Sequence, residues 1–113
     1  MGCGERQDYQ EAVKWYSLAA AQGYAPAEYS LGVAYEKGQG VPQDYREAVK
    51  WYRLAAAQGN PSAQIHLGEM YTHGTGLRQD FVRAHMWFNL AAAASTGNSR
   101  TRRQRIEIEL RHK

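Results

Sequence analysis

The residues able to do chemistry are few, and their spacing argues against a catalytic or metal centre. Four histidines occur in the chain: His66, His73, His85 and His112. His66 and His73 are seven residues apart on one predicted helix, which places them on the same face but roughly 10 Å apart along its axis. That separation is too large for the two rings to share one metal ion unaided. We therefore predict no metal site and no bound cofactor.

Paired carboxylates offer a second route to chemistry, as a general acid and a general base. Asp44 and Glu47 have that spacing, but so do Asp8 and Glu11. The same pairs suit the start of a helix, where the first acid caps the helix and the second reaches back to the cap's own N–H. Because an active site is seldom duplicated turn for turn, we interpret both pairs as caps and predict no catalytic residue and no enzyme activity.

Aromatic and glycine-rich motifs complete the set of candidates. The ladders Trp15/Trp51/Trp87 and Tyr16/Tyr52/Phe88 could stack nucleobases, yet their helical context favours packing in a core. Gly38-x-Gly40 and Gly74-x-Gly76 follow no predicted strand, so they indicate helix-to-helix turns and not phosphate loops. The chain has no nucleophile elbow and no His-Glu-x-x-His pattern.

The elements that carry these residues recur every 36 positions. Aligning residues 8–43 with 44–79 gives 21 identities in 36 positions, and a third copy of the first helix follows from Asp80. Each copy contains two helices punctuated by Gln-Gly and Gly-x-Gly turns, with no strand. Stacking of such helical hairpins builds a solenoid with one continuous core and a concave groove. We predict an all-α solenoid in a single domain spanning residues 1–113.

The predicted helices cover residues 8–22, 26–37, 44–58, 62–73 and 80–96, followed by a capping helix at 99–112. Asp8 and Asp44 should begin their helices, and Pro26 and Pro61 should open the second type. Gly32 and Gly68 lie in mid-helix, which predicts close approach to a facing helix, with the alanine pairs Ala19-Ala20 and Ala55-Ala56 as neighbours. In the 44–58 helix, Tyr45, Ala48, Tyr52 and Ala55 should form one buried face, with Trp51 and Leu54 toward another.

Composition sets the remaining bounds. With 43% hydrophobic and 22% charged residues, the chain has the profile of a soluble globular protein, and no apolar run is long enough to span a bilayer. We expect a cytoplasmic location, or a periplasmic one if a longer parent carries a signal peptide. Cys3 is the only cysteine, which excludes an intramolecular disulfide. The net charge of +3 comes from the tail, because residues 100–113 hold six Lys/Arg against two Asp/Glu.

The repeat resembles a known family. Ala63, Leu67, Gly68 and Tyr71, then Gly74-x-Gly76, then Asp80-Phe81, Ala84, Trp87-Phe88 and Ala91-Ala92, are similar to Sel1-like repeats, relatives of the tetratricopeptide repeat. The resemblance covers about residues 2–98. It implies a right-handed superhelix of about three repeats, with the Ala-x-x-x-Leu-Gly helices lining the concave side. It also implies the adaptor and scaffold roles that bacterial family members play, without the cysteine pairs of the disulfide-linked branch.

The partner-binding surface is expected where the repeats differ, because shared positions serve packing and turns. These positions form one stripe on each concave helix: Tyr29, Val33, Glu36 and Lys37, then Ile65, Glu69, Thr72 and His73. An aromatic and aliphatic centre with a charged rim suits a peptide groove. We predict a protein or peptide partner anchored by Tyr29 and Ile65, and no small-molecule substrate.

Two alternatives stay open. The chain could be a non-catalytic accessory domain of a larger enzyme or regulatory protein. Its basic segment from Arg100 to Lys113 could also bind nucleic acid or an anionic surface weakly. In addition, the first helix begins within a repeat, so we expect part of Trp15 or Tyr16 to be exposed, with fraying or self-association at that end.

Overall fold

The computed structural model describes residues 2–95, with side chains from residue 8 to residue 94, and these residues form helices and turns without a strand. The helices are α1 (Gly2–Ala21), α2 (Ala25–Lys37), α3 (Tyr45–Ala57), α4 (Pro61–His73) and α5 (Phe81–Ser95). Each packs against the next in chain order, and α2 also touches α4. The predicted capping helix at 99–112 lies outside the described residues.

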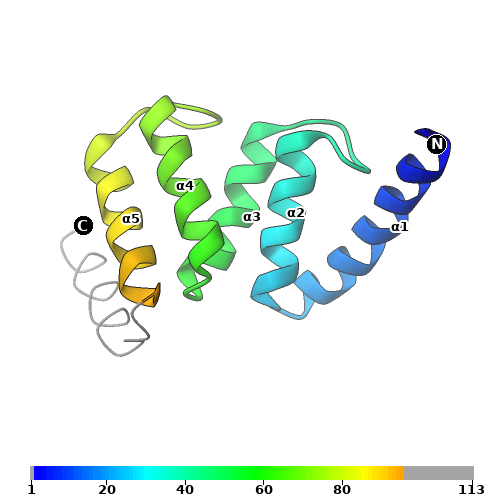
Figure 1. The fold of residues 1–113 in the computed structure, drawn as a ribbon, viewed down its shortest axis with the longest axis horizontal. Helices are drawn as coiled ribbons and strands as arrows, with labels where there is room; N and C mark the ends of the chain where they lie inside the picture. Colours follow the sequence, from blue (N-terminus) through cyan, green and yellow to red (C-terminus); the bar gives the residue numbers. More distant parts are fainter. Residues whose placement is uncertain (1, 96–113) are drawn as a thin grey trace.

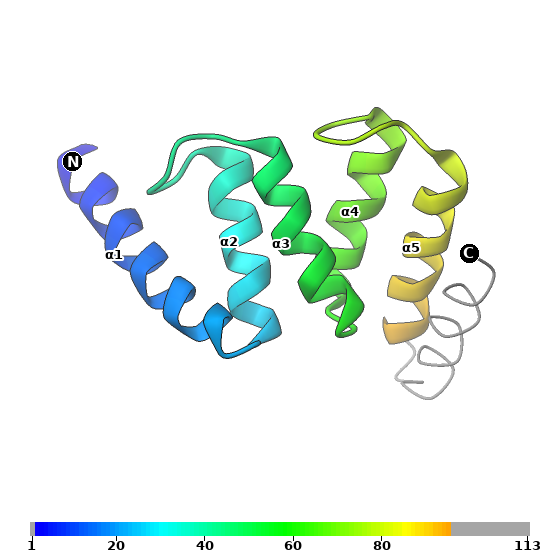
Figure 2. The same ribbon diagram turned by 180° about the vertical axis from the view of Figure 1, so that it is seen from behind.

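The helices stand side by side as an antiparallel row, which is the arrangement of an α-solenoid. Figure 1 shows α1 at one end of the row and α5 at the other, and Figure 2 shows the same row from behind. Both longer loops, α2–α3 and α4–α5, lie at one edge, whereas the short turns α1–α2 and α3–α4 lie at the opposite edge. The all-α solenoid predicted from the 36-residue period is confirmed.

Asp44 begins α3 as predicted. Its carboxylate accepts hydrogen bonds from the backbone N–H groups of Arg46 (3.0 Å) and Glu47 (3.2 Å), which have no partner inside the helix. The reciprocal half of the expected capping box is absent, because the Asp44 N–H donates to the Tyr35 carbonyl and so is not free for Glu47. Asp80 caps α5 in the same way, although Arg83 stands where the capping box has Glu.

The prediction for Asp8 was wrong. Helix α1 begins at Gly2, so Asp8 lies inside the helix, where every backbone N–H can find a carbonyl one turn back. The identical Asp-Tyr-x-Glu sequence starts a helix at residue 44, where Pro42 in the preceding loop is unsuited to a helix interior, whereas the equivalent residue before Asp8 is Arg6. The local sequence therefore permits a cap, and the segment before it decides whether one forms.

This difference gives a matched pair of substitutions. Asp44→Ala should lower the free energy of unfolding by about 1 kcal/mol, because it removes both cap bonds. Asp8→Ala, on an exposed site inside α1, should change it by less than about 0.5 kcal/mol. Urea denaturation followed by circular dichroism measures both values. Equal losses for the two variants would show that Asp44 does not act as a cap.

The second loop glycine of each Gly-x-Gly turn sits where no side chain fits. Gly40 has a φ of 83°, and a Cβ atom there would lie 2.5 Å from the carbonyl oxygen of Tyr9 in α1. Gly76 repeats the arrangement, with a Cβ position 2.7 Å from the carbonyl oxygen of Tyr45 in α3. Glycine is required at both sites because the loop of one hairpin rests on the backbone of the preceding helix.

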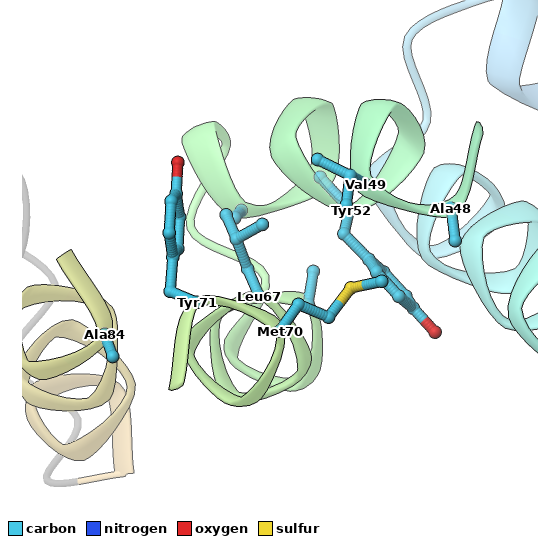
Figure 3. Close-up of a cluster of buried hydrophobic side chains, with 10 residues drawn as sticks. Ala48, Val49, Tyr52, Leu67, Met70, Tyr71 and Ala84 are labelled. Carbon is cyan, nitrogen blue, oxygen red and sulfur yellow. The ribbon is translucent and has the colours of Figure 1, made fainter. Parts of the chain in front are cut away.

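The main core lies between α3 and α4 and extends to α5. Figure 3 shows Tyr52 and Val49 of α3 beside Leu67 and Met70 of α4, with Ala84 of α5 beyond Tyr71. Tyr52 and Leu67 are completely buried. A smaller cluster of Ala20, Ala27 and Leu31 joins α1 to α2, and Trp51 packs against it from α3. The core thus consists of two clusters that follow one another along the row.

The mid-helix glycines do approach a facing helix closely, but the neighbour was predicted wrongly. A Cβ at Gly32 would lie 2.5 Å from ring carbons of Tyr52, and one at Gly68 would lie 2.7 Å from the ring of Phe88. Each glycine therefore accommodates an aromatic ring, and not the small side chains of the alanine pairs. The ring belongs to the following helix, so α2 pairs with α3 and α4 with α5.

Burial of the repeated aromatic positions is uneven. Tyr52 is 0% exposed, whereas its counterparts Tyr16 and Phe88 are each 37% exposed. Trp15 is 64% exposed, while Trp51 and Trp87 are half-buried. The exposure predicted for the first helix is thereby confirmed, and the prediction that all three tryptophans are core residues is wrong for Trp15. Tyr45 and Leu54, predicted to be buried, are both more than 40% exposed.

Candidate functional site

The structure places two hollows along α2 and α4, and we call the surface of these helices that carries both hollows the groove face. The first, the tyrosine hollow, has a volume of about 230 Å³. It lies between α1 and α2 and is lined by Tyr9, Ala12, Val13, Tyr16, Tyr29, Ser30, Val33, Ala34 and Gln39. Apart from Ser30 and Gln39, its lining consists of tyrosines and small aliphatic side chains.

The second, the acidic hollow, has a volume of about 200 Å³. It is lined by Glu36 of α2 and by His66, Glu69, Met70, His73 and Thr75 of α4 and the loop that follows. Four of these residues are 36 positions beyond members of the tyrosine hollow: Ser30 and His66, Val33 and Glu69, Ala34 and Met70, Gln39 and Thr75. The two hollows are therefore equivalent sites on successive repeats, with different chemistry.

A stack of rings joins α2, α3 and α4 beneath the groove face. The Tyr29 ring lies 5.8 Å from that of Tyr52 and 5.3 Å from that of His66, in the second case edge to face. The rings of Tyr52 and His66 are 5.1 Å apart. These separations are those of favourable aromatic pairs. The cluster fixes the relative position of the two helices that carry the hollows.

Tyr52 also holds one carboxylate of the acidic hollow in place. Its hydroxyl donates a 2.6 Å hydrogen bond to Oε1 of Glu36. Burial raises the pKa of the Tyr52 hydroxyl strongly, and the hydrogen bond and the negative charge of Glu36 raise it further. The phenol thus stays protonated and keeps its bond to Glu36 at neutral pH.

This shift predicts a loss of stability in alkali. Because the folded-state pKa of Tyr52 lies above the unfolded value of about 10, its contribution is complete below pH 10 and is lost as the pH rises above 10. The free energy of unfolding of the wild type should therefore fall faster than that of Tyr52→Phe between about pH 10 and 11.5. Urea titrations of both proteins at each pH measure the difference between their free energies of unfolding. The contributions of the other tyrosines cancel in this difference. Parallel pH profiles would contradict the assignment.

The eight residues predicted from the sequence fall into two groups. Five line a hollow: Tyr29 and Val33 the tyrosine hollow, and Glu36, Glu69 and His73 the acidic hollow. Lys37, Ile65 and Thr72 line neither hollow. Ile65 is 43% exposed, Lys37 is exposed, and the Thr72 hydroxyl donates to the Gly68 carbonyl within α4.

Sequence reasoning omitted His66 and Met70 from the groove stripe. Both differ from their counterparts Ser30 and Ala34, so the criterion of unshared positions already selected them. The omission arose because only one i, i+4 stripe was chosen, whereas a wider strip of the α4 surface faces α2. The prediction also missed Tyr9, Ala12 and Tyr16 of α1. These positions are shared between repeats, and shared positions were assigned to packing alone.

The described residues contain no cluster of three or more His, Cys, Asp or Glu side chains that could hold a metal ion. Between residues 2 and 95, no helix is both long enough and apolar enough to cross a bilayer. The groove face presents two hollows, aromatic surface and the carboxylates of Glu36 and Glu69.

Comparison with known families agrees with the architecture. The family described as the Sel1 repeat matches residues 2–24, 25–60 and 61–95. The chain belongs to the Sel1 repeat family. The second and third matches correspond to the hairpins α2–α3 and α4–α5, and the first match contains α1. Sel1 repeats are generally protein-interaction modules and are typically not catalytic.

Two solved structures show the same repeat. A protective antigen of uropathogenic Escherichia coli strains, with an SLR fold, is 52% identical over 72% of this chain, with a TM-score of 0.70. A Sel1 repeat protein from Oxalobacter formigenes is 40% identical over 75% of the chain, with a TM-score of 0.72. The aligned regions span 17% and 35% of those proteins. No curated protein matches the chain.

Proposed function

We propose that this chain is a protein-interaction module that binds a peptide or an exposed protein segment along its groove face. The observation that carries the proposal is the pair of equivalent hollows on successive Sel1 repeats. Each hollow is smaller than the 300–1,000 Å³ typical of small-molecule sites. Hollows of this size suit single side chains of an extended partner, and their spacing by one repeat lets one partner fill both.

Residues around the hollows support the same interpretation. Tyr29 and Val33 supply apolar surface on α2, and Ile65 on α4, which lines neither hollow, is 43% exposed. Glu36, Glu69 and His73 form a polar rim. An apolar centre with a polar rim is the usual anatomy of a peptide-binding interface. We propose Tyr29 and Ile65 as anchors, with Lys37 and Thr72 at the margin.

The experiment is to pan a displayed library of random dodecapeptides against the chain and to measure recovered peptides by fluorescence anisotropy. Val33→Asp and Ile65→Asp should each weaken binding at least tenfold, because they place a charge against an apolar contact. Leu54→Asp is the matched control: Leu54 is 44% exposed, as Ile65 is 43%, but it lies on α3 and not on α2 or α4, the helices of the groove face. Tyr29→Ala combined with Ile65→Ala should also abolish most of the affinity.

Recovery of no peptide above a blank surface would overturn the proposal. So would equal weakening by Ile65→Asp and Leu54→Asp, because binding would then not depend on the groove face. Circular dichroism melts of all variants separate lost binding from lost folding.

A role as an accessory domain of a larger protein is a second proposal, favoured by one observation. Both solved relatives are several times longer than the region that aligns with this chain. The groove face would then bind a partner for the larger protein. The alternative based on the basic segment Arg100 to Lys113 falls outside the described residues, and self-association through α1 stays a prediction.

A further inference from the structure

We propose that the groove face selects a partner segment that carries a lysine or arginine side chain close to a large apolar one. The cationic side chain would occupy the acidic hollow and the apolar side chain the tyrosine hollow. This inference rests on the proposed function, because it names the chemistry of the partner for the same surface.

The acidic hollow presents two carboxylates from two different helices. Glu36 comes from α2 and Glu69 from α4, and both are close enough to Tyr52 for their charges to act on its pKa. Glu36 is held by the Tyr52 hydroxyl through one oxygen, Oε1. Its second oxygen and the exposed Glu69 carboxylate are left to accept hydrogen bonds from a partner. Two acceptors from two helices that line one hollow suit an ammonium or a guanidinium group.

No cation of the chain neutralises this pair within the part of the structure that is described. Across residues 8–94, the single ion pair closer than 4 Å joins Arg83 to Asp80 on α5. Neither hollow is lined by a lysine or an arginine. The negative charge on the groove face is therefore available to a partner, although the chain as a whole carries a net charge of +3.

The remaining lining of the acidic hollow suits the stem of a long cationic side chain. Met70 is 3% exposed and presents a polarisable thioether, and His66 presents a ring already packed against Tyr29 and Tyr52. Lysine and arginine bury their methylene stems on such surfaces while the charged group stays at the polar rim. An aspartate or glutamate in the same position would meet two like charges. That repulsion should disfavour partners with an acidic side chain there.

The tyrosine hollow completes the pattern one repeat away. Where the acidic hollow has Glu69 and Met70, the tyrosine hollow has Val33 and Ala34, which removes the charge and leaves room. Tyr9, Tyr16 and Tyr29 surround that space with aromatic surface. A leucine, methionine or aromatic side chain fits it better than a charged one. A partner that lies along the groove face thus meets one apolar and one anionic subsite in turn.

The test uses the same panning experiment on the full chain at pH 8, with a chelator present. We compare the wild type with the double variant Glu36→Gln/Glu69→Gln. Glutamine at position 36 keeps an oxygen that accepts the Tyr52 hydrogen bond, so the fold is preserved. The matched control is Glu11→Gln/Glu47→Gln, which removes the same total charge from residues that line neither hollow.

Peptides selected by the wild type should be enriched in lysine and arginine over the unselected library and depleted in aspartate and glutamate. Their affinity should fall at least tenfold in Glu36→Gln/Glu69→Gln and less than twofold in the control, and it should weaken with added salt in the wild type. Equal losses in both double variants, or selected peptides without a basic preference, would overturn the inference.

Failure of this inference can be separated from failure of the proposed function. Peptides that depend on Val33 and Ile65 but show no basic preference would leave the peptide-binding role intact and remove only the cationic specificity. An absence of any peptide that depends on the groove face would remove both.

Discussion

Tyr52→Ala is expected to lower the free energy of unfolding by about 3–5 kcal/mol, the range for truncation of a buried aromatic side chain. Tyr52 is completely buried, contacts the rings of Tyr29 and His66, and donates a hydrogen bond to Glu36. Its removal opens a cavity where α2, α3 and α4 meet. Because a domain of this size is stable by only about 5–15 kcal/mol, the variant should be close to unfolding at 37 °C.

Tyr16→Ala is the matched control, since Tyr16 occupies the same repeat position in α1. Its side chain is 37% exposed and lines the tyrosine hollow, so its truncation should cost about 1 kcal/mol. Urea denaturation followed by far-ultraviolet circular dichroism gives both values. A similar loss for the two variants would show that the repeat position, and not its burial by the neighbouring helices, determines the contribution.

The comparison of Tyr16, Tyr52 and Phe88 also shows how far the sequence predicts the fold. The 36-residue period predicted the helices and their stacking, because apolar spacing and turn residues are local signals. It could not predict the burial of each copy. Burial depends on which helices cover a position from outside its own repeat, and a sequence pattern assigns the same role to all three aromatic residues.

The residues of the candidate site could be predicted only in part, for a related reason. Unshared positions directed the prediction to one face of α2 and α4, since residues that repeat are used for packing and turns, and the role of that face in binding a partner stays a prediction. Five of the eight predicted residues line a hollow. Ile65 and His66 show the limit: they are adjacent in sequence, and which of them faces α2 depends on the rotation of α4 about its axis. Packing sets that rotation, and the ring contacts of His66 with Tyr29 and Tyr52 reveal it.

The substitution Gly32→Ala tests the close approach of α2 to the ring of Tyr52 in α3. An alanine Cβ at this position would lie 2.5 Å from two ring carbons of Tyr52, far inside the 3.5–4.0 Å of an ordinary carbon contact. The ring has no space to withdraw, because it is fully buried and its hydroxyl is bound to Glu36. Overpacking of about 3 kcal/mol should exceed the gain of about 1 kcal/mol in helix propensity. We expect a net loss of about 2 kcal/mol, and a fall in Tm of about 8–16 °C.

Gly68→Ala makes the same chemical change in the next repeat with a different expected result. The Cβ would lie 2.7 Å from the ring of Phe88, which is 37% exposed and makes no hydrogen bond that would fix it. Phe88 can shift toward solvent, so the cost of overpacking is small and the helix-propensity gain offsets it. The expected change in the free energy of unfolding is within about 0.5 kcal/mol of zero. Thermal melts of both variants measure the difference. If Gly68→Ala is as damaging as Gly32→Ala, the cost of the added Cβ depends on its distance from the ring alone, and not on whether the ring can move. If Gly32→Ala is harmless, the ring of Tyr52 is not fixed by its surroundings. Our inference that this ring links α2, α3 and α4 rigidly and so positions the groove face is then wrong.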